Sequence, residues 1–258
     1  MLSITEHSYG LVGKCLSHSY SKVYFDEKIA KLGMDRHHYD LLEMPTPDKI
    51  RDVSIKNNLS GFNVTIPYKE SIIPYLDSID YSANEIGAVN TVKVLRDADG
   101  SLRLHGYNTD APAFLDTLRP LLKPWHTDAL ILGTGGAAKA VAWALRQLGI
   151  GYLFVSRTPE QRPDSIGYSE LKDSTQLLIV NATPVGMFPN VDASPWPYPD
   201  MLTQRHLCYD LIYNPSPTLF LRQAKQHEAT IQDGLAMLHR QADLAFEIWE
   251  GENKTESN

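Results

Sequence analysis

A glycine-rich turn between two apolar runs constrains this chain more than any other stretch. Residues 129–132 are apolar, glycines follow at 133, 135 and 136, an apolar-periodic segment then runs to Leu148, and a second apolar run covers 152–155. This order predicts a strand, a tight turn, a helix and a second strand. The helix then begins at the glycines, where its N-terminus can face an anion.

Dinucleotide-binding folds place three small residues at such a turn. The first allows the sharp turn, the second lets the backbone approach the pyrophosphate, and the third lets the helix pack closely. Here these positions are Gly133, Gly135 and Ala138. The alternative is an ordinary α/β turn whose glycines serve packing. The flanking strand and helix, and the lack of a Gly-Lys-Ser/Thr ending, favour the dinucleotide site.

The end of the second predicted strand indicates which dinucleotide is bound. An NAD site usually has Asp or Glu there, about 20 residues after the glycines, to accept hydrogen bonds from the ribose. This chain has Ser156, Arg157 and Thr158 instead. A guanidinium with two hydroxyls suits a 2′-phosphate, so the sequence favours NADP over NAD. The alternative for Arg157 is a solvated surface arginine.

Composition limits the class of protein. The 258 residues, 43% hydrophobic and 21% charged, are typical of a soluble globular protein with one large domain or two smaller ones. The net charge of -7 argues against a nucleic-acid surface. Without a signal segment or a membrane-length apolar run, we expect no membrane contact and a cytoplasmic location. We expect Cys15 and Cys208 to be reduced and buried.

The first 110 residues alternate strand and helix signals and predict an α/β domain ahead of the dinucleotide unit. A hairpin is expected from strands at 91–95 and 102–106. Ser19 or Ser21 can cap the helix that follows the first strand. Alternatively, the two serines hold a substrate carboxylate, and the residues leave these alternatives open. The histidines show no metal-ligand spacing, so no metal site is expected.

Short polar motifs complete the pattern. Lys69 ends the strand-like run GFNVTIPYK, and Asp110 ends NTD at the start of a predicted helix. A solvated lysine and a helix N-cap are the structural alternatives for these two side chains. Taken in order, the motifs are the serine pair, NVTIPYK (63–69), AVNT (88–91), NTD (108–110), GTGGAA (133–138), SRT (156–158), NATPVGM (181–187), YDLIY (209–213) and DGLAMLHRQA (233–242).

Together these motifs, in this order, resemble the shikimate dehydrogenase family. The resemblance implies a two-domain α/β fold: a substrate domain (1–110), a Rossmann-like NADP-binding domain (111–234) and a C-terminal helix (235–258) that packs back on the first. It implies reversible reduction of 3-dehydroshikimate to shikimate with NADPH, in the shikimate pathway of aromatic amino-acid (chorismate) biosynthesis. The expected partners are the small-molecule substrate and NADP, in a monomer or homodimer.

The resemblance also assigns roles to residues. It makes Lys69 the catalytic lysine and Asp110 its partner. The implied substrate-binding residues are Ser19, Ser21, Thr65, Asn90, Tyr213 and Gln241. The implied cofactor-binding residues are Gly133, Thr134, Gly135, Gly136, Ala137, Ser156, Arg157, Thr158, Leu211 and Gly234, with Met237 bordering the site.

Several positions depart from the family pattern. Ser156 stands where asparagine is common, Leu211 where methionine is common, and Gln161 where an arginine often supports the 2′-phosphate, although Arg162 is adjacent. Further departures are Cys15, Lys22, Phe25, Ala111 and Ala236. None affects the implied catalytic pair. The cofactor changes bear on NADP selectivity rather than on nucleotide binding.

Three alternative functions remain open. An NAD-preferring quinate/shikimate dehydrogenase is disfavoured because no carboxylate lies at 156–158. A catalytically silent ligand sensor on the same fold is disfavoured because Lys69 and Asp110 are both present. A folate-type methylene dehydrogenase would give the serine pair and the NTD motif no purpose.

Overall fold

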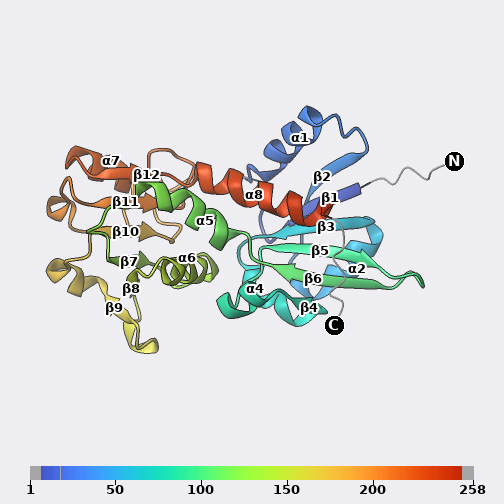
Figure 1. The fold of residues 1–258 in the computed structure, drawn as a ribbon, viewed down its shortest axis with the longest axis horizontal. Coiled ribbons are helices and arrows are strands. Elements are labelled where there is room, and N and C mark those ends of the chain that lie inside the picture. Colours follow the sequence, from blue (N-terminus) through green and yellow to red (C-terminus); the bar gives the residue numbers. More distant parts are fainter. Residues whose placement is uncertain (1–6, 18, 252–258) are drawn as a thin grey trace. The chain divides into compact units, whose positions relative to one another are not determined.

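The computed structural model describes residues 7–17 and 19–251. Its contacts divide the chain into two units, each described by itself below. Unit 1 contains the chain up to Thr109 and again from Gln241, and unit 2 is Asp110–Arg240. Helix α8 (Leu235–Glu250) therefore contributes its first turns to unit 2 and the rest to unit 1 (Figure 1).

Among the described residues of unit 1, six strands form a mixed sheet in the order β2-β1-β3-β5-β6-β4 (Figure 1). The pairs β2–β1, β1–β3 and β4–β6 are parallel, and β3–β5 and β5–β6 are antiparallel. The predicted hairpin is confirmed as β5 and β6. The strands are β1 (His7–Gly13), β2 (His37–Glu43), β3 (Leu59–Val64), β4 (Ser78–Ile79), β5 (Thr91–Arg96) and β6 (Leu102–Tyr107).

Helices cover both faces of this sheet. On one face, the core joins β1 and β2 to α1 and to the unit 1 part of α8, and on the other it joins the strands to α2, α3 and α4. Side chains of β1 alternate accordingly, because Leu11 belongs to the first core and Val12 to the second. The helices are α1 (Ser21–Lys31), α2 (Ile50–Lys56), α3 (Tyr68–Ser71) and α4 (Tyr81–Ile86), with short 3-10 turns Pro47–Lys49 and Ile73–Tyr75.

Trp249 anchors the end of α8 on the sheet of unit 1. Its ring stacks on Tyr9 with centroids 4.7 Å apart, and its Nε1 donates to the Val92 carbonyl at 3.0 Å. A Cβ on Gly61 would lie 2.3 Å from Trp249 Cδ1, so only glycine leaves room for the indole. The prediction that the last helix packs on the first domain is confirmed.

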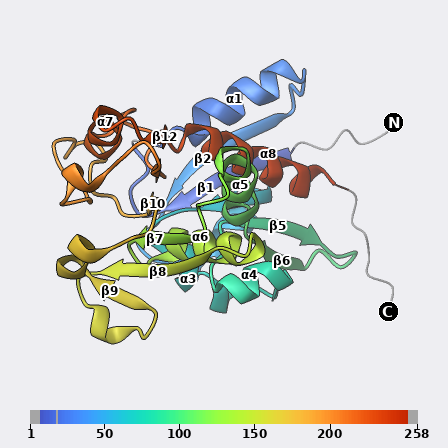
Figure 2. The same cartoon turned by 60° about the vertical axis from the view of Figure 1, so that its left-hand side comes forward.

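All of residues 110–240 are described, and six strands there form an all-parallel sheet in the order β12-β11-β10-β7-β8-β9 (Figure 1). Figure 2 shows this sheet from a second direction. The predicted strand–turn–helix–strand unit is confirmed as β7, α6 and β8. The strands are β7 (Asp128–Leu132), β8 (Gly151–Ser156), β9 (Ser165–Gly167), β10 (Leu178–Asn181), β11 (Leu207–Asp210) and β12 (Thr230–Gln232).

Both faces of the unit 2 sheet are also covered. Tyr209 of β11 contacts Phe114 of α5 edge-on at 4.9 Å and hydrogen-bonds Thr117 at 2.8 Å, which places α5 on one face. On the opposite face, α7 contributes Phe220 to the core cluster that contains Cys208. The helices are α5 (Asp110–Leu118), α6 (Gly136–Gln147) and α7 (Leu219–Gln226), with 3-10 turns Arg119–Leu121, Pro159–Gln161, Tyr168–Asp173 and Pro199–Met201.

The two cysteines differ. Cys208 is buried in β11, and burial raises the pKa of its thiol. Cys15 is exposed, so the prediction that it is buried was wrong: it lies in the loop after β1, where the neighbouring Leu16 takes the buried place. Within residues 7–17 and 19–251, no helix combines the length and apolar character that a membrane span needs.

Candidate active site

Lys69 and Thr65 lie just beyond the carboxyl end of β3. The Thr65 amide donates to the Val12 carbonyl at 2.9 Å, which extends the parallel pairing of β1 and β3 past the end of the strand. Lys69 lies in the short helix α3, half-buried, and its carbonyl accepts a hydrogen bond from the Val89 amide at 2.7 Å. The backbone of Lys69 is thus bonded directly to the segment that carries Asn90.

Asn90 is buried in a network that reaches Gln241. Its Oδ1 accepts from the Thr109 amide at 2.7 Å, and its Nδ2 donates to Thr109 Oγ1 at 2.9 Å and to Gln241 Oε1 at 3.4 Å. Thr91 Oγ1 also donates to Asn90 Oδ1, at 3.2 Å. These bonds fix the orientation of the amide, and they bring together two predicted substrate residues that are far apart in the sequence.

Ser19 lies just before α1, and Ser21 is the first residue of this helix. Ser19 Oγ accepts a hydrogen bond from the Ser21 amide at 3.2 Å. The Ser21 side chain is hydrogen-bonded to the phenol of buried Tyr39, whose pKa is raised well above its ordinary value, mainly by burial. Ser21 and Tyr39 thus begin a polar network in unit 1, and the capping and substrate-binding roles of the two serines both stay predictions.

Tyr39 and Asn63, to which the motifs assigned no role, extend this network to Asn90. The Tyr39 hydroxyl donates to Asn63 Oδ1 at 2.9 Å, and Asn63 Nδ2 donates to the Asn90 carbonyl at 3.3 Å and to Thr91 Oγ1 at 3.1 Å. An asparagine between buried apolar neighbours in NVTIPYK was the available signal, because buried amides require partners. Tyr39 carried no such signal, because it depends on the register of β1, β2 and β3.

Asp110 begins α5 and is buried, and Tyr213 is half-buried after β11. Both belong to unit 2, whereas Lys69 belongs to unit 1. The roles of Asp110 and Tyr213 therefore stay predictions from the resemblance.

The glycine-rich turn of unit 2 has the geometry of a phosphate-binding corner. Gly133 has φ +103°, and a Cβ there would lie 2.9 Å from Thr183 Cγ2 and 3.2 Å from the Ala182 carbonyl, so the position requires glycine. Helix α6 starts at Gly136, and Gly135 supplies no side-chain cap. The amides of the first turn can therefore bind an anion, and residues 133–137 surround them.

The three residues expected at the adenosine phosphate follow one another at the end of β8, where Ser156 is the last residue of the strand. Ser156 Oγ accepts from the Thr158 amide at 3.0 Å, and Thr158 Oγ1 donates to Gln161 at 3.3 Å. Arg157 is exposed. Arg162, by contrast, is bidentate to Asp164 at 2.9 and 3.0 Å and lies 4.1 Å from the Phe154 ring centroid. Arg157 is the better placed of these two arginines to meet a phosphate.

Asp210 organises two loops at the carboxyl end of the unit 2 sheet, and the sequence analysis assigned it no role. Its carboxyl group accepts from Asn181 Nδ2 at 2.9 Å, the Ile212 amide at 3.0 Å and Thr218 Oγ1 at 2.7 Å. Burial raises its pKa to about 6, and these donors offset part of the rise. Asp210 thereby joins the NATPVGM motif (181–187) to residues 211–218, which include the end of the YDLIY motif.

Leu211 and Gly234 are in close contact. A Cβ on Gly234 would lie 2.1 Å from the Leu211 carbonyl oxygen, so this approach excludes every side chain. Met237, which follows in α8, is buried. The two positions expected near the nicotinamide are thus brought together within unit 2.

Sequence comparison with known proteins also identifies the shikimate dehydrogenase family. The model of the shikimate dehydrogenase substrate binding domain matches residues 11–92. A shikimate dehydrogenase (NADP(+)) from Crocosphaera subtropica is 37% identical over 268 residues, covering 93% of this chain and 89% of the relative. One from Thermus thermophilus is 35% identical over 252 residues, covering 94% and 92%.

Solved structures agree. A shikimate 5-dehydrogenase from Thermus thermophilus, in complex with NADP(H) and shikimate, matches with a TM-score of 0.82 and 34% identity, covering 95% of this chain and 94% of that one. Quinate dehydrogenase from Corynebacterium glutamicum, in complex with NAD, also has a TM-score of 0.82, covers 95% and 94%, but is only 26% identical. This chain belongs to the shikimate dehydrogenase family.

Proposed function

We infer that this protein is an NADP-dependent shikimate dehydrogenase, which interconverts 3-dehydroshikimate and shikimate. One observation carries the inference: the backbone of Lys69 is bonded at 2.7 Å to the segment bearing Asn90, whose amide is bonded to Gln241. This bond supports our proposal that the Lys69 ammonium and these amides form one site within unit 1. We propose that unit 1 serves as the substrate domain and unit 2 as the NADP domain.

Lys69 supplies charge stabilisation and a proton. NADPH, when bound, supplies the hydride that reduces the ring ketone. Negative charge then builds on the ketone oxygen, and the ammonium of Lys69 stabilises it and donates the proton. Lysine is ordinarily protonated at neutral pH, so it is a good donor but needs help as a base in the reverse direction. We propose Asp110 as the partner of Lys69, which is the role that the resemblance gives it.

The remaining polar groups select the substrate. Ser21, Thr65 and Asn90 would bind the carboxylate and the ring hydroxyls, together with Ser19, Tyr213 and Gln241. An analogue that lacks one hydroxyl leaves a buried partner unpaired, which costs far more affinity than a lost apolar contact. The bonds of Asn90 to Thr109 and Gln241 support this role because they fix the amide in advance.

The residues of unit 2 fit NADP. The first turn of α6 would bind the pyrophosphate, with Gly133 keeping the backbone close to it. Ser156, Arg157 and Thr158 would bind the 2′-phosphate, since no carboxylate there repels it. Leu211 and Gly234 would border the nicotinamide.

A matrix of substrates and cofactors tests the proposal. We expect the wild-type protein to oxidise shikimate with NADP, and to do so at least about tenfold more efficiently than with NAD, because one charge-assisted contact contributes about 1.5–3 kcal/mol. Faster turnover of quinate with NAD would indicate the rival dehydrogenase. Ligand binding without turnover of any pair would indicate the silent sensor.

A further inference from the structure

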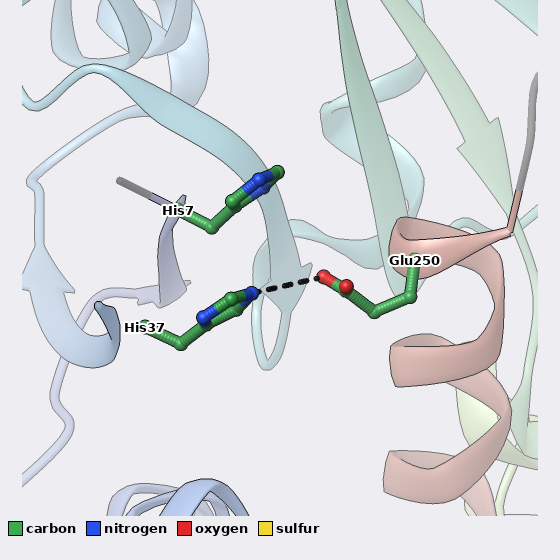
Figure 3. A group of neighbouring side chains, drawn as sticks. All are labelled: His7, His37 and Glu250. Atoms are coloured by element: carbon green, nitrogen blue, oxygen red, sulfur yellow. Dashed lines mark ion pairs between the residues drawn. The ribbon is translucent and has the colours of Figure 1, made fainter. Parts of the chain in front are cut away.

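A second cluster of functional side chains lies at the amino ends of β1 and β2, within unit 1. His7 and His37 are the first residues of these strands and are paired in the parallel register. Glu250 is the last residue of α8 and points toward them (Figure 3). Nothing in the proposed reaction uses these three residues.

The spacing of the three side chains is close to that of a metal site. One potential ligand atom from each lies within 4.8 Å of the other two, and His37 Nε2 is 3.6 Å from Glu250 Oε1 (Figure 3). Ligands at Zn–N distances of about 2.0–2.1 Å in a tetrahedron lie about 3.3 Å apart. The His37–Glu250 pair already approaches that separation, and His7 must come closer.

The ring of His37 is only partly satisfied, because its closest polar contact is the 3.6 Å ion pair of Nε2 with Glu250. Both of its ring nitrogens are buried and have no hydrogen-bond partner among the residues that the structure describes. Orphaned buried polar atoms are rare in folded proteins and point to a water or ion.

The surroundings of Glu250 suit a metal ligand. The Tyr9 hydroxyl donates to Glu250 Oε1 and so orients the carboxylate. Hydrogen bonds of this kind are typical of the residues behind metal ligands. The rings of His7 and His37 stack at 4.8 Å between centroids with 6° between their planes, so a shared ion requires the half-buried His7 ring to turn.

We propose that His7, His37 and Glu250 bind one divalent transition-metal ion of the zinc class. Two imidazoles and a carboxylate are ligands that Zn²⁺ accepts, with water completing the coordination. The ion would join the end of α8 to two strands of the sheet. Its effect is therefore on the stability of unit 1 and not on the reaction.

The position of the cluster separates it from the proposed reaction. His7 and His37 lie at the amino ends of their strands, whereas Lys69 and Thr65 follow the carboxyl end of β3, which runs parallel to β1. On α8, Gln241 and Glu250 are separated by about 13 Å at about 1.5 Å per residue. The metal site of His7, His37 and Glu250 does not depend on which substrate the protein turns over. The metal proposal and the proposed dehydrogenase function can therefore fail separately.

Zinc and cobalt titrations test the proposal on the whole chain. We expect one Zn²⁺ per chain by calorimetry, with Kd below about 10 μM, and a rise in Tm of about 5 °C at roughly a hundredfold excess over Kd. Co²⁺ in the same site should give the visible absorption of a four-coordinate ion. Rates with shikimate and NADP should stay unchanged at this zinc concentration.

Zn²⁺ binding by single-residue variants tests which side chains bind the ion. His37→Gln and Glu250→Gln should each weaken Zn²⁺ binding at least about tenfold, as expected for loss of one ligand. His38→Gln is the matched control, because His38 is the next residue of β2, faces the other way and bonds Ser8 at 2.5 Å. Equal circular dichroism spectra confirm folding. No binding by the wild type, or binding that persists in both ligand variants, overturns the proposal.

Discussion

The two ends of the unit 1 sheet carry sites of different construction. At the carboxyl end, the residues proposed for the reaction come from short contiguous motifs, such as NVTIPYK with Thr65 and Lys69. At the amino end, His7, His37 and Glu250 come from three segments far apart in the chain, and only strand register and the packing of α8 bring them together. Chemistry concentrated in a motif is visible in a sequence, whereas a site assembled by packing is not.

After Lys69, the largest effect is expected at the carboxyl end, from Asn90→Ala. The change removes a proposed substrate contact and leaves the buried Thr109 amide without its acceptor. The lost substrate contact, about 1.5–3 kcal/mol for a hydrogen bond to a charged group, should lower kcat/KM about 10- to 150-fold. Steady-state kinetics with shikimate measures it.

The matched control for that variant is Asn57→Ala, at the exposed end of α2, where the side chain donates to the Val53 carbonyl of the same helix. It should leave kcat/KM within about twofold, as for an ordinary surface substitution. If Asn90→Ala behaves like this control, the network is structural and the comparison between the two ends fails.

The carboxyl end of the unit 2 sheet should respond to pH through Asp210. Its pKa in the folded state is raised from 3.8 to about 6, so the folded state binds more protons than the unfolded state between these values. The stabilising contribution is full below pH 3.8 and is lost as pH rises through about 6, by at most about 3 kcal/mol. Urea unfolding of wild type and Asp210→Asn, compared across this range, measures the difference. A difference independent of pH would show that Asp210 is ionised throughout.

The anchoring of α8 at Gly61 gives a smaller effect on stability. Gly61→Ala forces Trp249 out of its place against the strand, which should destabilise unit 1 by about 2 kcal/mol, as for an overpacked core. Because Glu250 follows Trp249 directly, the same variant should weaken zinc binding at the amino end. Ser60→Ala in the same strand is the control, and denaturant unfolding with and without Zn²⁺ measures both effects.

The smallest effect is expected from Arg157 of the SRT motif, on KM for NADP. Arg157→Ala should raise KM for NADP about tenfold and leave KM for NAD unchanged, because we propose that the guanidinium binds the 2′-phosphate, which NAD lacks. Arg162→Ala should change the preference little, since Arg162 is already bidentate to Asp164. If Arg162→Ala has the larger effect, the ion pair opens when NADP binds.

Local patterns predicted the elements that depend on neighbours in sequence. The β7–α6–β8 unit, the β5–β6 hairpin and the position of Gly133 all follow from nearby residues. The bonds from Tyr39 to Asn63 and from Asn181 to Asp210 could not be predicted from nearby residues. Each bond joins residues on different strands, and the register of those strands is set by tertiary packing. The burial of Cys15 was predicted wrongly for the same reason, because the loop places Leu16 inward instead.

The absence of a metal-ligand spacing led to the expectation of no metal site. That inference holds only for ligands carried on one helix or loop. His7 and His37 become neighbours because β1 and β2 are parallel and start in register. The spacing of His7 and His37 in the sequence does not indicate that they are neighbours in the fold.

The most direct test of the account is the initial rate of shikimate oxidation with NADP by wild type, Lys69→Ala and the surface control Lys56→Ala. Removing a general acid or base costs about 100- to 10,000-fold, so Lys69→Ala should lose at least about 100-fold in kcat while Lys56→Ala stays at the wild-type rate. A Lys69→Ala protein within about threefold of wild type would contradict the assignment of the chemistry to the carboxyl end of this sheet.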